Sequence, residues 1–199
     1  MKIYHYTKGI SMNSIFTDGF IATESKRGIN RISKLTNCAW LTEKTQFPKT
    51  ALPFISTMPE TNLFMHLNKS IYVDLNKLSQ FTGGIYRFGF DSNESRFVKW
   101  KFSNERKVVE NNIEWKKMES VANKVGDDYR SFWISPTDVR LEKFSLDEFS
   151  DGGWKSLLTD CSLDSMTKDQ VDVIKKIKAI SVSICNTYGL PISQSLKAA

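Results

Sequence analysis

The chain has 199 residues, a formal net charge of +6 and 40% hydrophobic residues. This length suits one domain, or one domain with an added lobe, and the five Trp, six Tyr and 13 Phe exclude a disordered chain. No apolar run approaches the 18 residues of a membrane span, and the N-terminus MKIYHYTKG lacks the apolar stretch of a signal peptide. We therefore expect a cytoplasmic protein with no membrane partner.

The cysteine and histidine contents argue against disulfide and metal chemistry. Cys38, Cys161 and Cys185 are widely spaced and odd in number, so they form neither a disulfide framework nor a zinc signature. His5 and His66 are the only histidines, which leaves little material for a metal site. We expect no metal cofactor, and the basic balance favours an anionic partner or substrate.

Short strands dominate the first 145 residues. A strand is predicted over 2–7, followed by a helix over 11–17 that Gly19 ends and by an extended piece at Phe20-Ile21. The polar, basic stretch 23–37 predicts a long loop, and three prolines interrupt regular structure over 46–62. Further strands are predicted over 38–42, 70–74, 85–90, 97–102, 132–134 and 139–144, with a turn at Gly83-Gly84.

Two helices are predicted in the second half of the chain. The first covers 105–125, with a buried side of Val108, Val109, Ile113, Trp115, Met118 and Val121. The second begins at Thr167, which forms a capping box with Gln170, and its apolar side carries Val171, Ile174, Ile177, Ile180, Ile184 and Tyr188. This side either packs onto the domain or docks a partner, and packing is favoured because most amphipathic helices bury their apolar stripe.

Short strands with segregated helices indicate the α+β class. We expect a domain over residues 1–150 and a C-terminal helical extension over residues 151–199 that packs on it. No Gly-rich phosphate loop, nucleophile elbow or metal-spaced cluster is present. Composition and periodicity alone therefore predict no activity.

Four short pieces of sequence follow one another over about residues 2–145. They are Tyr4-His5-Tyr6-Thr7, Cys38-Ala39-Trp40-Leu41-Thr42, Tyr86-Arg87-Phe88 and Phe132-Trp133-Ile134-Ser135. A short helix ending at Asp18-Gly19 follows the first piece. In order and spacing these features resemble the ADP-ribosyltransferase-like domains. The resemblance implies a split, strongly bent β-sheet with peripheral helices that clasps NAD, the substrate, in its cleft.

The resemblance also implies roles for particular residues. His5 would act in catalysis by hydrogen-bonding the NAD ribose, with Thr7 beside it on the strand. Trp40 would form a wall for nicotinamide, with Thr42 on the same strand face, and Arg87 would clamp the pyrophosphate. The alternatives are a structural His5, a core Trp40, and an Arg87 that points to solvent from an edge strand.

The catalytic carboxylate departs from the family pattern. Many members carry a Glu at the start of the strand that corresponds to 131–135, and this chain has Arg130-Ser131 there. We take Glu119 as the replacement because it stands alone among apolar and basic neighbours, and Asp127 or Asp128 are alternatives. Absence of the carboxylate is the other alternative, and it admits a domain of the same fold that binds NAD, another nucleotide or a partner without catalysis.

Basic residues favour a macromolecular acceptor for ADP-ribose, with RNA or DNA slightly ahead of protein. Arg27, Arg31 and Lys34, with Lys26, crowd the loop that would select this acceptor, and a solvated loop is the alternative. Lys99, Lys101, Arg106 and Lys107 form a second cluster, and neither cluster has the regular aromatic interleaving of a stacking platform.

Small enzymes of this kind resemble toxins of toxin–antitoxin or phage-defence systems and phage-encoded effectors. An antitoxin or another protein partner would then be expected, and the C-terminal helix is one place for it to bind. An RNA phosphotransferase related in fold is a third hypothesis. It would need Arg87, Arg27 and Arg31 to converge on one cleft.

Overall fold

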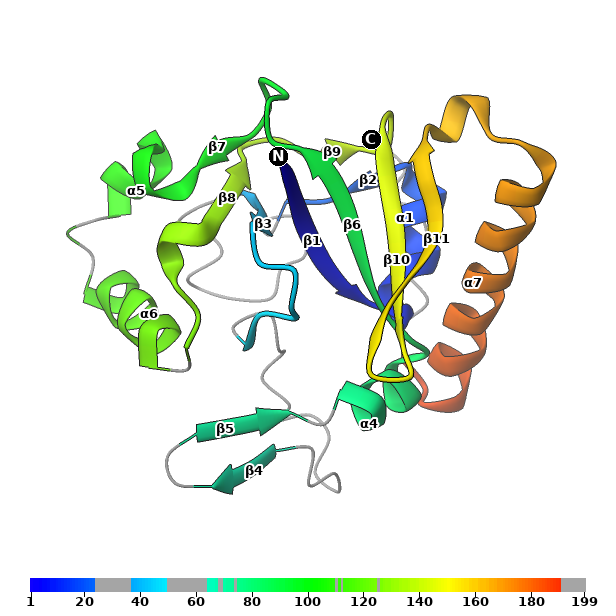
Figure 1. Cartoon of the computed structure of the whole chain (residues 1–199), viewed down its shortest axis with the longest axis horizontal. Helices are drawn as coiled ribbons and strands as arrows, with labels where there is room; N and C mark the ends of the chain where they lie inside the picture. Colours follow the sequence, from blue (N-terminus) through cyan, green and yellow to red (C-terminus); the bar gives the residue numbers. More distant parts are fainter. Residues whose placement is uncertain are drawn as a thin grey trace. The chain divides into compact units, whose positions relative to one another are not determined.

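A computed structural model describes residues 1–23, 37–49, 64–67, 70–73, 75–109, 111, 113–124 and 126–190 (Figure 1). Strands and helices alternate irregularly over these residues. The strands are β1 (Lys2–Lys8), β2 (Phe20–Ile21), β3 (Ala39–Thr42), β4 (Phe64–Leu67), β5 (Ser70–Val73), β6 (Ile85–Asp91), β7 (Val98–Lys99), β8 (Phe132–Ser135), β9 (Val139–Arg140), β10 (Phe144–Ser150) and β11 (Gly153–Cys161). The strand pairs β1–β3, β3–β8, β7–β8, β6–β10, β10–β11 and β4–β5 are antiparallel, which confirms the α+β class.

Five α-helices lie within the described residues, and four 3-10 turns accompany them. The α-helices are α1 (Met12–Asp18), α4 (Leu75–Thr82), α5 (Asn104–Val109), α6 (Ile113–Lys124) and α7 (Lys168–Thr187). The 3-10 turns are η1 (Gly9–Ser11), η4 (Trp100–Phe102), η5 (Tyr129–Ser131) and η6 (Leu163–Ser165). None of these helices combines the length and the apolar character that crossing a bilayer requires.

Contacts divide the chain into two compact units, and β1 contributes residues to both. The first unit comprises residues 1–5, 22–73 and 91–139, and the second comprises 6–21, 74–90 and 140–199. The predicted assignment of function to 1–150 and of a helical extension to 151–199 stays a prediction.

The first unit contains the strand run β1-β3-β8-β7. β3 pairs antiparallel with β8, so that Trp40 faces Ile134 and Thr42 faces Phe132. A buried cluster lies beside these strands and joins them to η4 and α5, with partly buried aromatic rings packed around it. The cluster consists of Cys38, Trp100, Val109 and Ile134.

The second unit contains the strand run β11-β10-β6-β1. Phe88 of β6 packs at ring-centroid distances of 5.7 Å from Phe144 and 5.8 Å from Phe16. α1 ends at Gly19, whose φ of 77° is left-handed, as a C-terminal glycine allows. The predicted helix and its glycine stop are therefore confirmed.

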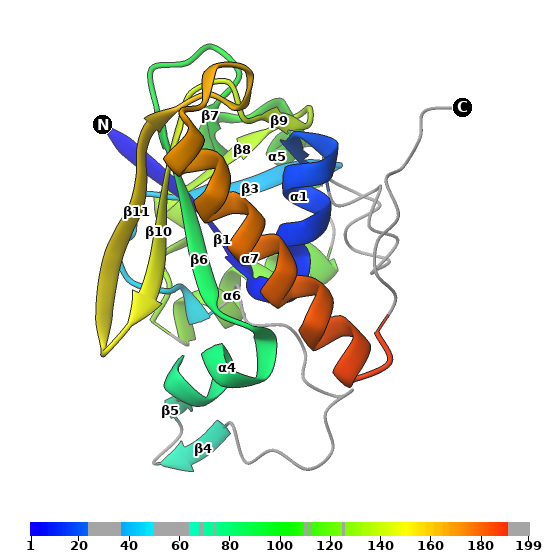
Figure 2. The ribbon, with the colours of Figure 1, turned by 90° about the vertical axis from the view of Figure 1, so that its right-hand side faces the viewer.

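The C-terminal helix α7 packs along α1 within the second unit (Figure 2). Its capping box between Thr167 and Gln170 is present, as predicted. Asn13 donates its backbone N–H to the Ser181 hydroxyl at 3.2 Å, and Ser181 is fully buried. Packing, one of the two interpretations of this helix, is therefore observed.

The buried side of α7 differs from the predicted stripe. Ile180 and Tyr188 are each 46% exposed, and the buried residues are Ile174, Ile177, Ser181 and Cys185. A helix turns about 100° per residue. The buried residues follow one another at spacings of three, four and four, which keeps them on one face of the helix. The predicted stripe from Val171 to Ile180 uses three spacings of three, which carries its last residue off that face. The prediction selected residues by apolar character and did not account for this rotation around the helix.

Two predicted elements of the first unit are also different in the structure. The expected strand over 97–102 is β7 followed by the 3-10 turn η4, and the expected helix over 105–125 is divided into α5 and α6. Val108, predicted to be buried, is 81% exposed, whereas Val109 is buried. α5 has only six residues and therefore offers its apolar side chains a narrow face.

Candidate functional site

In the first unit, a hydrogen bond connects two of the predicted site residues, His5 of β1 and Trp40 of β3. His5 of β1 places Nδ1 2.9 Å from the carbonyl oxygen of Trp40, and His5 is 8% exposed. A carbonyl oxygen only accepts, so this contact assigns the proton of a neutral His5 to Nδ1. Nε2 is then an acceptor and is buried from solvent, and the backbone of the neighbouring strand fixes the imidazole orientation.

The Trp40 side chain belongs to an aromatic cluster. Its ring lies 4.8 Å from that of Trp100 and 6.2 Å from that of Phe132, measured between centroids. Trp100 is completely buried, and Trp40 is partly buried against the same cluster. Trp40 therefore packs as core on at least one side, while its partial exposure leaves the predicted nicotinamide contact open.

Glu119 of α6 accepts hydrogen bonds from Trp100 and Arg106. The indole Nε1 of Trp100 donates to Oε1 at 3.2 Å, and the Arg106 guanidinium donates to Oε1 at 3.1 Å and to Oε2 at 3.4 Å. The Glu119 side chain is 16% exposed. Because Trp100 also contacts Trp40, one chain of contacts connects His5, Trp40 and Glu119, and the carboxylate that we predicted as catalytic is oriented by its neighbours.

Glu119 also lines a broad surface depression of about 540 Å³. Its other lining residues are polar or aromatic, and they come from α6 and η5: Lys116, Ser120, Asn123, Lys124 and Tyr129. The depression is wide and open to solvent, so it is a surface feature and not an enclosed cleft. Two ammonium groups at its wall favour an anionic occupant.

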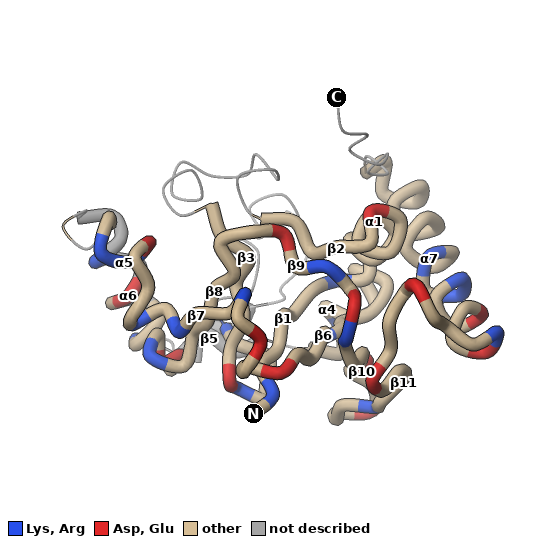
Figure 3. Tube along the Cα trace, turned by 90° about the horizontal axis from the view of Figure 1, so that it is seen from above, with Lys and Arg blue, Asp and Glu red and all other residues tan. Residues whose placement is uncertain are grey.

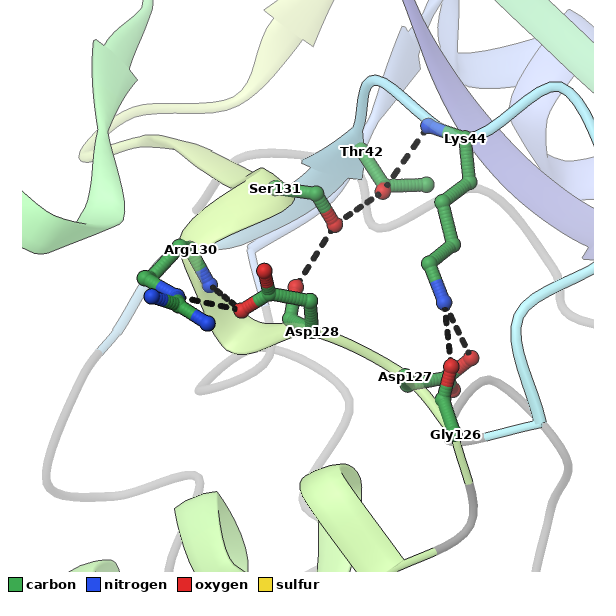
Figure 4. A network of polar contacts seen from close by, with 7 residues as sticks. All are labelled: Thr42, Lys44, Gly126, Asp127, Asp128, Arg130 and Ser131. Carbon is green, nitrogen blue, oxygen red and sulfur yellow. Dashed lines mark hydrogen bonds and ion pairs between the residues drawn. The ribbon is translucent and has the colours of Figure 1, made fainter.

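A polar network joins the end of β3 to the segment between α6 and β8 (Figure 4). Ser131 donates its hydroxyl proton to the carbonyl oxygen of Asp128 at 2.7 Å. The 3.2 Å contact between the Thr42 and Ser131 hydroxyls therefore uses the Thr42 proton, and Thr42 Oγ1 accepts the Lys44 backbone N–H at 3.2 Å. Thr42, at 3% exposed, uses its hydroxyl to hold the strand end.

The two alternative carboxylates occupy different environments in this network. Asp127 is 4% exposed and pairs with the Lys44 ammonium at 3.1 Å. Asp128 is half exposed and accepts the backbone N–H of Arg130 at 2.9 Å and its guanidinium at 3.0 Å. These bonds, the backbone N–H foremost, lower the pKa of the Asp128 carboxyl below its ordinary value.

Sequence reasoning did not consider Glu43, the residue after β3. Its Oε1 accepts the Trp133 indole N–H at 2.8 Å and lies 2.7 Å from the Lys99 ammonium. Lys99 in turn lies 5.7 Å from the centroid of the Trp133 ring. A Glu directly after a predicted functional strand, with a Trp in the next paired strand, was the signal available in the sequence.

Thr7 and Arg87 belong to the second unit. Thr7 is buried, and the Arg87 guanidinium lies 2.7 Å from a carboxylate oxygen of Asp147 and 4.5 Å from the centroid of the Trp154 ring. Arg87 and Asp147 are cross-strand partners of β6 and β10. The expected alternative of a solvent-directed Arg87 is thus wrong, since its side chain is 11% exposed, and the pyrophosphate clamp stays a prediction.

The remaining predicted contacts concern the basic loop and metals. Arg27, Arg31 and Lys34 lie outside the described residues. In the described part of the chain, no group of three or more His, Cys, Asp or Glu side chains is placed to hold a metal ion.

Comparisons with family models, curated proteins and solved structures found no match to the chain.

Proposed function

We propose that the protein is an NAD-dependent ADP-ribosyltransferase that modifies a macromolecule, nucleic acid ahead of protein, as a toxin or phage-conflict effector. The observation that carries the proposal is the contact between His5 and the Trp40 carbonyl. It joins two of the four sequence pieces that carry the resemblance, and it orients the residue with the proposed catalytic role.

The His5 contact specifies how a ribose would be bound. With its proton donated to Trp40, neutral His5 presents Nε2 as an acceptor, and a ribose hydroxyl would donate to it. Nε2 is buried from solvent in the structure, so a ribose would have to displace the atoms that cover it. Loss of nicotinamide develops positive charge on the ribose, and a nearby carboxylate stabilises that charge. Glu119 is the favoured carboxylate because it lines the depression beside α6 and contacts Trp100, the ring partner of Trp40.

A variant of His5 that keeps the structural bond gives the sharpest test. In His5→Asn the amide nitrogen takes the place of Nδ1 and donates to the Trp40 carbonyl, while the Nε2 acceptor is lost. We expect wild-type protein to release nicotinamide from NAD in the presence of an acceptor and His5→Asn to be at least a hundredfold slower. Equal rates at unchanged melting temperature would remove the role of His5.

A non-catalytic domain that binds NAD, another nucleotide or a partner is the second candidate, and the Glu119 environment favours it. Both carboxylate oxygens of Glu119 already accept from Arg106, which is also the pattern of a structural ion pair. This candidate predicts that NAD raises the melting temperature without any release of nicotinamide. Release by the wild-type protein separates the two candidates, and in the first Glu119→Gln should abolish that release while NAD binding persists.

A further inference from the structure

We propose that the surface formed by η4 and α5 binds single-stranded nucleic acid, with a base stacked on Phe102 and phosphates held by Lys101 and Lys107. The proposal rests on the proposed function in one respect, since the bound strand would be the acceptor of ADP-ribose. The binding itself requires neither NAD nor catalysis.

Phe102 is exposed because of the local backbone geometry. In a strand over 97–102, Trp100 and Phe102 would share one face. In the 3-10 turn η4, residues two apart point in different directions, and Trp100 is completely buried while Phe102 is 67% exposed. The structure thus places a large aromatic ring in solvent beside a basic helix.

The four cations of the second basic cluster divide into two pairs. Lys99 lies 2.7 Å from Glu43 and Arg106 lies 3.1 Å from Glu119, so carboxylates neutralise both. Lys101 and Lys107 are exposed, and neither forms an ion pair with a described residue.

The two exposed lysines flank the exposed ring in sequence. The Lys101 ammonium lies 5.4 Å from the centroid of the Phe102 ring, and Lys107 lies on α5, which packs against η4. The basic residues of α5 appear in blue in Figure 3. Among the described residues, these two cations have no ion-pair partner, so they remain for an anion on this surface.

The combination of an exposed ring with lysines selects the ligand class. Every base has a face that stacks on an aromatic ring, and single strands present that face while duplexes hide it. Phosphates of the same strand would meet Lys101 and Lys107. An acidic protein would pair its carboxylates with the lysines but would have no base to stack on the Phe102 ring. Its affinity would therefore not depend on Phe102 in the way that the affinity for a single strand does.

Fluorescence anisotropy with labelled 12-nucleotide RNA, DNA and duplex tests the proposal without NAD. We expect both single strands or one of them to bind more tightly than duplex. Phe102→Ala should weaken binding at least fivefold, and Phe102→Trp should retain it. The double variant Lys101→Gln/Lys107→Gln should make the salt dependence shallower by about 1.4 in the slope of log K against log[salt], or about 0.7 per lost phosphate contact.

Helix α7 provides a matched control in the second unit. Tyr188 is an exposed aromatic residue and Lys176 an exposed lysine, and Tyr188→Ala/Lys176→Gln should leave binding unchanged. The proposal is overturned if Phe102→Ala binds as wild type does, if duplex binds equally well, or if no strand binds at low salt. Nicotinamide release is measured separately, so failure of either proposal is visible without the other.

Discussion

The Lys44 ammonium lies 3.1 Å from a carboxylate oxygen of Asp127 and donates to the carbonyl oxygen of Gly126 at 2.7 Å. It thereby anchors the segment after α6 to the end of β3, beside the hydroxyl pair of Thr42 and Ser131. The Asp127 side chain is 5% exposed, whereas Lys44 keeps 28% of its side chain in solvent. The strand that carries Trp40 is therefore fixed by an ion pair with one nearly buried member.

Removal of Lys44 should deprive the nearly buried Asp127 carboxylate of the ion pair with the Lys44 ammonium. We expect Lys44→Met to lower the free energy of unfolding by about 2–4 kcal/mol, as measured by urea denaturation. Lys44→Met/Asp127→Asn should recover part of this loss because no buried charge is stranded. The exposed pair of Lys175 and Asp172 is the control, and Lys175→Met should cost less than about 0.5 kcal/mol.

Arg87 should not tolerate replacement by lysine. Its guanidinium bonds Asp147 at 2.7 Å and lies over the Trp154 ring, and a lysine ammonium reproduces neither the planar fork nor the stacking. We expect Arg87→Lys to lower the free energy of unfolding by about 1–3 kcal/mol. If the variant unfolds like wild type but loses affinity for NAD, Arg87 serves a ligand rather than the sheet.

Asp128 should make the protein less stable in acid. The pKa of its carboxyl in the folded protein lies below the ordinary 3.8 of an unfolded chain. The stabilisation that the ionised Asp128 carboxylate contributes to the folded state is therefore fully present well above pH 3.8. It is lost as the pH falls through the folded-state pKa. Asp128→Asn keeps an acceptor for the Arg130 N–H, so chemical denaturation between pH 6 and 2 should show a weaker pH dependence for this variant. An unchanged pH profile would contradict this.

Local patterns predicted most strands and the ends of two helices. Gly19 and the capping box of Thr167 act within a few residues of chain, so the helix ends that they set can be predicted without tertiary structure. The C-terminal stripe failed at Ile180, because apolar character alone does not say which face meets α1. Similarly, Phe102 is exposed because it lies in a 3-10 turn, which the spacing of apolar residues did not predict.

The candidate site was less predictable than the fold. Alternation along strands indicated neither that His5 would bond the Trp40 carbonyl nor that Glu119 would meet Trp100 and Arg106. Such contacts join segments from 13 to 35 residues apart, and packing selects them. The hairpin of β10 and β11 was also missed, although Asp151-Gly152 is a strong turn signal.

That turn provides a test of backbone strain. Gly152 has a φ of 78°, and a Cβ atom added there would meet no atom within 4 Å. We expect Gly152→Ala to lower the free energy of unfolding by about 1–2 kcal/mol through left-handed strain alone. Gly153 offers the same open space without a positive φ, so Gly153→Ala should be nearly neutral when both variants are compared by thermal unfolding. Equal effects of the two substitutions would exclude strain as the cause.

Nicotinamide release from NAD by purified protein, with and without single-stranded RNA, DNA or cell lysate, tests the proposed function most directly. We expect release that rises with a single strand, falls with Phe102→Ala and is lost in His5→Asn. The absence of release under every condition, together with an unchanged melting temperature in NAD, would contradict the proposed function and the resemblance from which it starts.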